Sequence, residues 1–324
     1  MRWTARFLLL SLSNNVPAGQ LCSAGLSSRV KNKSVSQNNY CSFWLWLNVL
    51  GLDAPIVAVA WQFFFAEALR LKIPTSNYLV LGLIVWVIYS ADRLLDARRL
   101  RAPETASARH RFYRDWFHIM MPLTMAGFIF SIVAVLMVLP ETILYCGAVL
   151  FLFVIVYFIH RIWVNGPMLV VLPKEIFTGM VFALGTTLTG YAWSSDIPDA
   201  FFSPEVLCFG GLCSLNCMAI SIWERDADAD NDGNALPQIF PSIVPYFAFL
   251  CWGVVIAGAI FSWMQKGSVT FPVFLAVTTG GGLLALLSSF EKRMSPVTLR
   301  VAADFAVLLP VFVYLPLLPW DLTF

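Results

Sequence analysis

Charged residues are scarce in this sequence. Asp, Glu, Lys and Arg make up 12% of its 324 residues, hydrophobic residues make up 59%, and the mean hydropathy is +0.75. Apolar stretches of about twenty residues, the length that crosses roughly 30 Å of hydrocarbon, recur along the chain. The composition therefore excludes a soluble protein and predicts an all-α, polytopic transmembrane bundle. We expect membrane lipids around it and no nucleic-acid partner.

Several common functional motifs are also missing. The seven cysteines form no C-x-x-C pair, and most lie in apolar runs, which is typical of small packing residues. Gly280–Gly282 follows no strand, so it predicts a close helix contact and not a phosphate loop. The run Asp228–Gly233 begins like an EF-hand, but Ile239 stands where that calcium loop requires a bidentate Glu.

The N-terminal region lacks acidic residues altogether, since the first acid of the chain is Asp53. This region is rich in Ser and Asn, and its one apolar run, Phe7–Leu12, is short for the core of a signal peptide. We expect residues 1–44 to be a polar tail, either disordered or involved in targeting. Residues 45–324 are then one transmembrane domain.

Nine apolar spans are predicted in that domain, and the basic residues orient them. The spans cover roughly 47–69, 78–96, 117–139, 142–160, 173–193, 204–223, 242–263, 270–290 and 298–318. If the first span leaves the cytoplasm, all 21 Lys and Arg residues except Arg70, Lys72 and Lys266 lie on the cytoplasmic side. The sequence thus predicts a multi-pass protein in a cell membrane or an organelle membrane.

Two acidic groups stand where spans two and six reach that side. Asp92 and Asp96 form the first group, and Glu224, Asp228 and Asp232 form the second. A spacing of four residues places side chains on one helix face, and carboxylates at the negative end of a helix favour a bound cation. Magnesium is the expected ion, because one or two carboxylates commonly hold it together with substrate phosphates. The alternative is that these are solvated loop acids.

These groups resemble the two aspartate-rich motifs of the UbiA-type intramembrane prenyltransferases, N-D-x-x-D-x-x-x-D and D-x-x-x-D-x-x-x-D. Asp92 and Asp96 match the last two acids of the first motif. Glu224, Asp228 and Asp232 match the second motif with one Glu for Asp. The run from Glu224 to Asp228 is similar to the family's D-R-x-D-D, and the resemblance implies nine helices around a central cavity.

One departure from the family is clear. Ile88 and Tyr89 occupy the positions of the Asn-Asp pair that opens the first motif, and neither is an ordinary magnesium ligand. This leaves two carboxylates in the first group, so the sequence predicts weaker metal binding, a different substrate or altered chemistry.

The resemblance implies a magnesium-dependent transfer of a polyprenyl group from a prenyl diphosphate to a lipophilic or aromatic acceptor. The implied catalytic residues are Asp92, Asp96, Glu224 and Asp228, with Asp232 as a further ligand of Mg²⁺. Lys174 falls where the family often has a basic residue near the diphosphate. Arg99 and Arg109, in the basic loop 97–116, are expected diphosphate contacts, although membrane orientation alone also explains that loop.

Two other functions fit the sequence less fully. A UbiA-like transporter or lipid-binding bundle would keep the acidic cavity without ionising a diphosphate. A CDP-alcohol phosphotransferase would need the motif D-G-x-x-A-R, and Asp92-Arg93 lacks that glycine. Asp53 and Asp304, both inside apolar spans, are expected to face a cavity or a partner, because carboxylates are costly in hydrocarbon.

Overall fold

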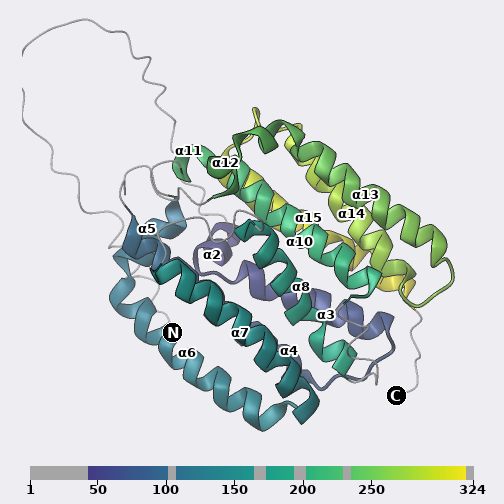
Figure 1. Cartoon of the computed structure of the whole chain (residues 1–324), viewed down its shortest axis with the longest axis horizontal. Coiled ribbons are helices and arrows are strands. Elements are labelled where there is room, and N and C mark those ends of the chain that lie inside the picture. The colour runs from purple at the N-terminus through teal and green to yellow at the C-terminus, as the bar shows by residue number, and fades with distance from the viewer. Residues whose placement is uncertain (1–42, 101–106, 164–172, 193–201, 229–234, 319–324) are drawn as a thin grey trace, which may run out of the picture. The chain divides into compact units, whose positions relative to one another are not determined.

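The computed structural model describes residues 43–100, 107–163, 173–192, 202–228 and 235–318 (Figure 1). All regular secondary structure in these residues is helical, which confirms the predicted all-α class for this part of the chain. The predicted tail, residues 1–44, lies outside the described residues except for its last two positions.

In the described residues, nine long helices lie at the positions of the nine predicted spans. They are α3 (Asp53–Ala68), α4 (Thr75–Arg99), α6 (Phe117–Val138), α7 (Glu141–Trp163), α8 (Lys174–Ala192), α10 (Pro204–Trp223), α13 (Phe247–Met264), α14 (Phe271–Ser288) and α15 (Pro296–Tyr314). The short helices are α2 (Phe43–Val49), α5 (Ala108–Asp115), α11 (Arg225–Asp228), α12 (Leu236–Ile239), and the 3-10 turns η1 (Pro241–Tyr246) and η2 (Leu315–Leu317). Figure 1 shows α5, α11 and α12 at one end of the long helices.

Of the described helices, 7 are long and apolar enough to cross a membrane, so the chain has the character of a multi-pass membrane protein. The two long helices outside this set are α3 and α8. Helix α3 has 16 residues, which at 1.5 Å per residue span roughly 24 Å. Helix α8 begins with Lys174 and Glu175 and contains four threonines, which lower its hydropathy.

The first predicted span is broken in two. Gly51 adopts φ +72°, a conformation that favours glycine, and it separates α2 from α3. A Cβ at this position would also meet the hydroxyl of Tyr113 at 3.2 Å. The break places the amino end of α3, with Asp53, inside the bundle.

The start of helix α10 follows a simple sequence rule that also applies to α15. Ser203 caps α10 by accepting a hydrogen bond from the Val206 amide, and Pro204 occupies the first turn. Ser295 caps α15 in the same way, with its hydroxyl accepting from the Thr298 amide at 3.2 Å. Serine at the cap followed by proline is a strong helix-start signal, because proline has no amide hydrogen to leave unpaired.

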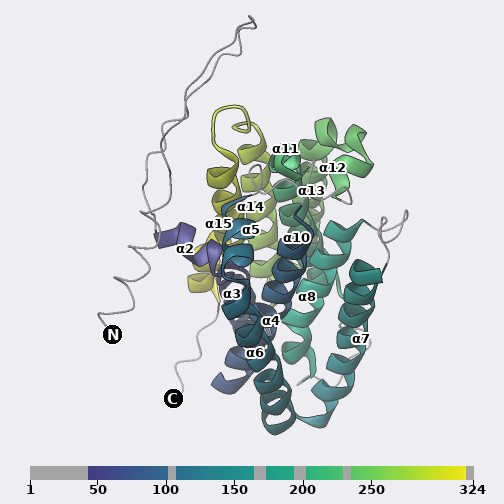
Figure 2. The same cartoon turned by 90° about the vertical axis from the view of Figure 1, so that its left-hand side faces the viewer.

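Helices α3 and α10 are the interior helices of the bundle. Helix α3 contacts α4, α8, α14 and α15, and α10 contacts α8, α13, α14 and α15. By contrast, α6 and α7 are peripheral, because only 17% of the residues in the apolar stretch of each are buried, against 67% in α10. Figure 2 shows α7 at one side. The exposed apolar faces of α6 and α7 are suited to contact with lipid.

Large aromatic side chains fill the space between the interior helices. Trp61, Phe64 and Phe65 of α3 and Phe209 of α10 are all fully buried, and we call these four residues the aromatic core. The rings of Trp61 and Phe209 stack with centroids 4.2 Å apart. The Trp61 indole donates to the Val307 carbonyl of α15 at 3.0 Å. Side chains therefore occupy the interior at this level, and the central cavity stays a prediction.

Helices α8 and α10 approach each other closely through small residues. A Cβ at Gly179 would meet the Ser214 backbone nitrogen at 2.3 Å, which real structures do not allow. Small residues at a helix contact let two backbones approach, as is common in membrane bundles. This contact places the start of α8, with Lys174, beside the carboxyl end of α10.

Candidate functional site

The carboxyl ends of α4 and α10 meet through helix α5. Arg109 Nη2 lies 2.8 Å from Glu224 Oε2, at the end of α10. The next residue, His110, places its Nε2 3.8 Å from Asp96 Oδ2, in the last turns of α4. Because Arg109 and His110 are consecutive, the two acidic groups of the sequence lie in one neighbourhood.

Glu224 forms a buried ion triad with two arginines. Its Oε2 pairs with Arg109, and its Oε1 accepts a hydrogen bond from Arg300 Nη1 of α15 at 3.2 Å. The exposed fractions are 14% for Arg109, 5% for Glu224 and 3% for Arg300. Two guanidinium groups and one carboxylate leave a net positive charge in the triad, which favours a bound anion.

Arg300 has unused hydrogen-bonding capacity in this triad. Its Nε and Nη2 are buried and have no hydrogen-bond partner among the described residues. A buried donor without a partner is costly. A phosphate group is a suitable partner, because the guanidinium fork matches its oxygens.

The two acids of α4 have different contacts from Glu224. The hydroxyl of Tyr157, in α7, donates to Asp92 Oδ1 at 3.0 Å. Asp96 stands one turn later and lies near His110. Residues four apart share a helix face, so both carboxylates point to the same side of α4.

The start of α8 joins the same region. Glu175 Oε1 accepts hydrogen bonds from the Ser221 hydroxyl at 2.8 Å and from the Leu236 amide at 2.9 Å. The thiol of Cys217, in α10, has four charged groups within electrostatic range. They are Glu175, Asp304, Lys174 and Asp92. Helices α4, α8, α10 and α15 thus all contribute charge to one region.

Arg93 anchors the broken first span to α4. It is 3% exposed and donates to the Asn48 carbonyl at 2.5 Å, at the carboxyl end of α2. Its Nη2 lies 3.7 Å from Asp53 Oδ2, and its guanidinium lies over the Tyr89 ring, 4.2 Å from the centroid. Tyr89 therefore provides an aromatic face for a cation.

We call this set of interior polar residues the polar layer. It consists of Asp53, Tyr89, Asp92, Arg93, Asp96, Arg109, Lys174, Glu175, Glu224, Arg300 and Asp304.

The remaining predicted site residues are elsewhere or not described. Arg99 Nη2 donates to the Ile162 carbonyl of α7 at 3.2 Å on an exposed face, so the structure does not bring Arg99 into the polar layer. Asp228 is the last residue of α11, and its side chain is not described. Asp232 lies outside the described residues.

The sequence reasoning missed the role of Arg300, which it used only to orient the spans. Arg300 and Asp304 are four residues apart near the start of α15, so they share a face, and this spacing was the available signal. Tyr157 carried no such signal, because its contact with Asp92 depends on how α7 packs.

The fit of the described residues to magnesium is partial. They contain no group of three or more His, Cys, Asp or Glu side chains that could hold a metal ion. Asp92 and Asp96 suit an ion that is completed by phosphate oxygens and water. Glu224 suits it less well, because arginines bind both of its oxygens.

The comparisons with known proteins identify no relative. No family model matches the chain, and no curated protein and no solved structure matches it.

Proposed function

We propose that this chain is an integral membrane prenyltransferase with its active site at the polar layer. The observation that carries the proposal is the pair of consecutive residues Arg109 and His110, which contact Glu224 of α10 and Asp96 of α4. The reaction breaks the carbon–oxygen bond of a prenyl diphosphate, and the diphosphate leaves with the electron pair. The allylic carbon then bonds to a lipophilic or aromatic acceptor, which releases a proton.

The positive groups of the polar layer have a direct role in this reaction. Arg109 and Arg300, held by Glu224, and Lys174 at the start of α8 bind the diphosphate and stabilise the charge that develops as it leaves. Because Glu224 holds both guanidinium groups in place, they need little rearrangement to stabilise this charge. A magnesium ion, when bound at Asp92 and Asp96 and assisted by Asp228 and Asp232, would supply further charge neutralisation.

The apolar half of the bundle protects the intermediate. An allyl cation must be kept from water until the acceptor attacks it. The aromatic core, whose rings are fully buried, keeps water from the apolar side of the polar layer. The hydrogen bond from Trp61 to Val307, three residues beyond Asp304, fixes this core next to the polar layer.

The geometry also supports nine crossings with the polar layer on the cytoplasmic side. The ends of α4 and α10 lie together, so the chain crosses the membrane an even number of times between them. Helices α6, α7, α8 and α10 give four crossings, whereas leaving out α8 would give three. Helix α3 also counts as a crossing. It begins at Asp53 in the polar layer, and its Phe63 contacts Tyr78 near the start of α4, which is the end of α4 away from that layer. The distribution of Lys and Arg then favours the cytoplasmic face for the layer in this proposal.

A second candidate is a transporter or lipid-binding bundle. The observation that favours it is the triad itself, in which arginines occupy both oxygens of Glu224. Such a site would bind an anionic headgroup and leave it intact. The two functions therefore differ in whether diphosphate is released.

The test is an assay of diphosphate release by the purified chain in detergent. Labelled prenyl diphosphates of several lengths are supplied with and without magnesium and with a panel of acceptors. We expect magnesium-dependent release that falls about a hundredfold in Asp92→Asn, because electrostatic groups of this kind are worth a few kcal/mol in the transition state. Asp115→Asn, on an exposed residue of α5, is the matched control. Binding of the prenyl diphosphate without release would contradict the enzyme and support the transporter.

A further inference from the structure

The outer side of helix α5 is basic. Arg111 and Arg114 are exposed there, and their spacing of three residues places them on one helix face. His110 and Tyr113, on the other side of the same helix, are buried. Arg98, in the last turn of α4, is also exposed.

Arg98 reaches the start of α6, which follows α5 directly. Its guanidinium lies over the Phe117 ring, 5.1 Å from the centroid. The rings of Phe112 and Trp116 stack with centroids 6.2 Å apart, and all three rings pack against one small apolar cluster at the end of α4. Basic and aromatic side chains together are typical of the level where membrane helices meet lipid headgroups. We call the three exposed arginines the basic face: Arg98, Arg111 and Arg114.

The basic face carries an excess of positive charge. Arg114 Nη2 lies 3.1 Å from Asp115 Oδ1, so this carboxylate offsets one of the three guanidinium groups. Neither Arg98 nor Arg111 forms an ion pair with another described residue. The excess charge favours an anionic partner, and the fork of a guanidinium matches phosphate oxygens.

The surface becomes apolar directly beyond the basic face. Ile119, Met121 and Leu123, in the first turns of α6, are 44%, 42% and 50% exposed. A molecule with an anionic head and apolar chains would contact both parts of this surface. A soluble phosphate would contact the arginines alone, so the surface favours a phospholipid.

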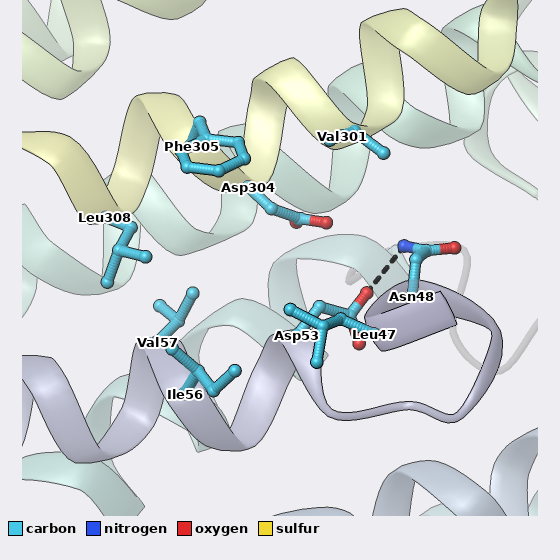
Figure 3. Close-up of a pocket in the computed structure, with 9 residues that line it drawn as sticks. All are labelled: Leu47, Asn48, Asp53, Ile56, Val57, Val301, Asp304, Phe305 and Leu308. Carbon is cyan, nitrogen blue, oxygen red and sulfur yellow. Dashed lines mark hydrogen bonds between the residues drawn. The ribbon is translucent and has the colours of Figure 1, made fainter. Parts of the chain in front are cut away.

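The pocket between α3 and α15 is no alternative site for such a molecule. Asp53 and Asp304 approach each other across it, and its cavity volume is about 40 Å³, which suits a few water molecules and no lipid chain (Figure 3). A larger apolar hollow, of about 400 Å³, lies between α10 and α13. No charged residue lines that hollow, so it cannot select a headgroup by charge.

We propose that the basic face binds the headgroup of an anionic phospholipid, whose acyl chains lie along the exposed apolar side of α6. The guanidinium groups of Arg98 and Arg111 donate hydrogen bonds to the headgroup phosphate. Helix α5 also carries Arg109, which pairs with Glu224 in the polar layer, so the bound lipid holds one side of that layer in place. The lipid site itself does not depend on the prenyltransferase function.

The test measures lipid binding to the purified full-length chain in detergent by native mass spectrometry. The probes are phosphatidylglycerol and phosphatidylcholine with identical acyl chains, so that only the headgroup differs. No prenyl diphosphate is present. We expect the wild type to bind phosphatidylglycerol about tenfold or more tightly, because each arginine near an anionic headgroup strengthens binding severalfold.

The double variant Arg98→Gln, Arg111→Gln should lower this preference at least about fivefold. Both side chains are exposed, so the variant should fold, and its thermal unfolding midpoint without added lipid checks this. The matched control is Lys292→Gln, Arg293→Gln, which removes the same charge from exposed positions between α14 and α15. Neither control side chain lies over a described aromatic ring, and the control should change the preference less than about twofold.

Three results would overturn the proposal. The first is equal binding of the two lipids by the wild type, and the second is an equal loss of preference in the two double variants. The third is displacement of phosphatidylglycerol by the same concentration of glycerol phosphate, which has the charge but no acyl chains. That result would assign the basic face to soluble phosphate.

The failure of this proposal and that of the enzyme are distinguishable, because diphosphate release is measured separately. If the wild type selects phosphatidylglycerol through the basic face but releases no diphosphate, the lipid site stands and the prenyltransferase function falls. If diphosphate is released but the two lipids bind equally, the enzyme stands and the lipid site falls.

Discussion

The polar layer and the aromatic core share helices α3 and α10 and are held together by different forces. Helix α3 carries Asp53 at one end and Trp61 two turns later, and α10 carries Phe209 in its first turns and Glu224 at its end. In the polar layer, ion pairs and hydrogen bonds fix the side chains. In the aromatic core, ring packing fixes them.

Ligand binding and folding stability rest on different parts of this bundle. Buried charges add little net stability, because desolvation offsets their attraction, yet removing one partner of a pair is costly. Packed aromatic rings stabilise directly through the apolar area that they bury. We therefore attribute ligand binding to the polar layer and the larger share of folding stability to the aromatic core.

The largest effect should come from Glu224→Ala. It leaves Arg109 and Arg300 buried without their shared counter-charge, which should cost about 3–5 kcal/mol. Thermal unfolding in detergent measures this loss. Adding Arg300→Met to Glu224→Ala removes one of the unpaired charges and should recover part of it. An unchanged unfolding midpoint in Glu224→Ala would show that the triad does not exist.

A comparable loss, by a different mechanism, should follow from Trp61→Ala. Removing a buried indole leaves a cavity and costs about 3–5 kcal/mol. Binding of inorganic diphosphate to the folded protein should stay within about twofold of wild type, because the polar layer is intact. Arg300→Gln should instead reduce the affinity for diphosphate about tenfold or more, because it removes a guanidinium group of the polar layer. If Trp61→Ala lowered diphosphate affinity as much as Arg300→Gln does, the two regions would not be separable.

A smaller effect on stability is expected at the contact between α8 and α10, where two glycines of α8 can be compared. Gly179→Ala forces the helices apart at Ser214 and should cost about 1–3 kcal/mol through overpacking. Gly185→Ala, on the same helix, meets nothing within 4 Å and should be neutral or stabilising by up to about 1 kcal/mol. Equal unfolding midpoints for the two variants would contradict the close approach of α8 to α10.

Much of the fold could be predicted from the sequence, because long apolar runs determine where membrane helices form. In the described residues each predicted span has a helix at its position, and 7 of these helices are long and apolar enough to cross a membrane. The break at Gly51 could not be predicted, since it depends on Arg93 binding the Asn48 carbonyl across the bundle. The aromatic core between α3 and α10 likewise depends on which helix faces meet.

The candidate site could be predicted only in part. The four-residue spacing within each acidic group pointed to the ends of α4 and α10, where Asp92, Asp96 and Glu224 lie, but their role in a site stays a prediction. Arg109 and Arg99 look alike in the sequence, yet Arg109 pairs with Glu224 and Arg99 binds the end of α7. Only the packing of α5 distinguishes them.

The shared site depends most directly on whether α5 and the end of α10 lie together in the native protein. Arg109→Cys and Glu224→Cys, in a chain whose native cysteines are replaced by alanine, would be treated with a short bismaleimide and analysed by peptide mass spectrometry. We expect an efficient intramolecular cross-link between positions 109 and 224. The control pair, Arg111→Cys with Glu224→Cys, uses an exposed position on the same helix and should react poorly. Absence of the link at 109, or equal links at 109 and 111, would contradict a shared site at the ends of α4 and α10.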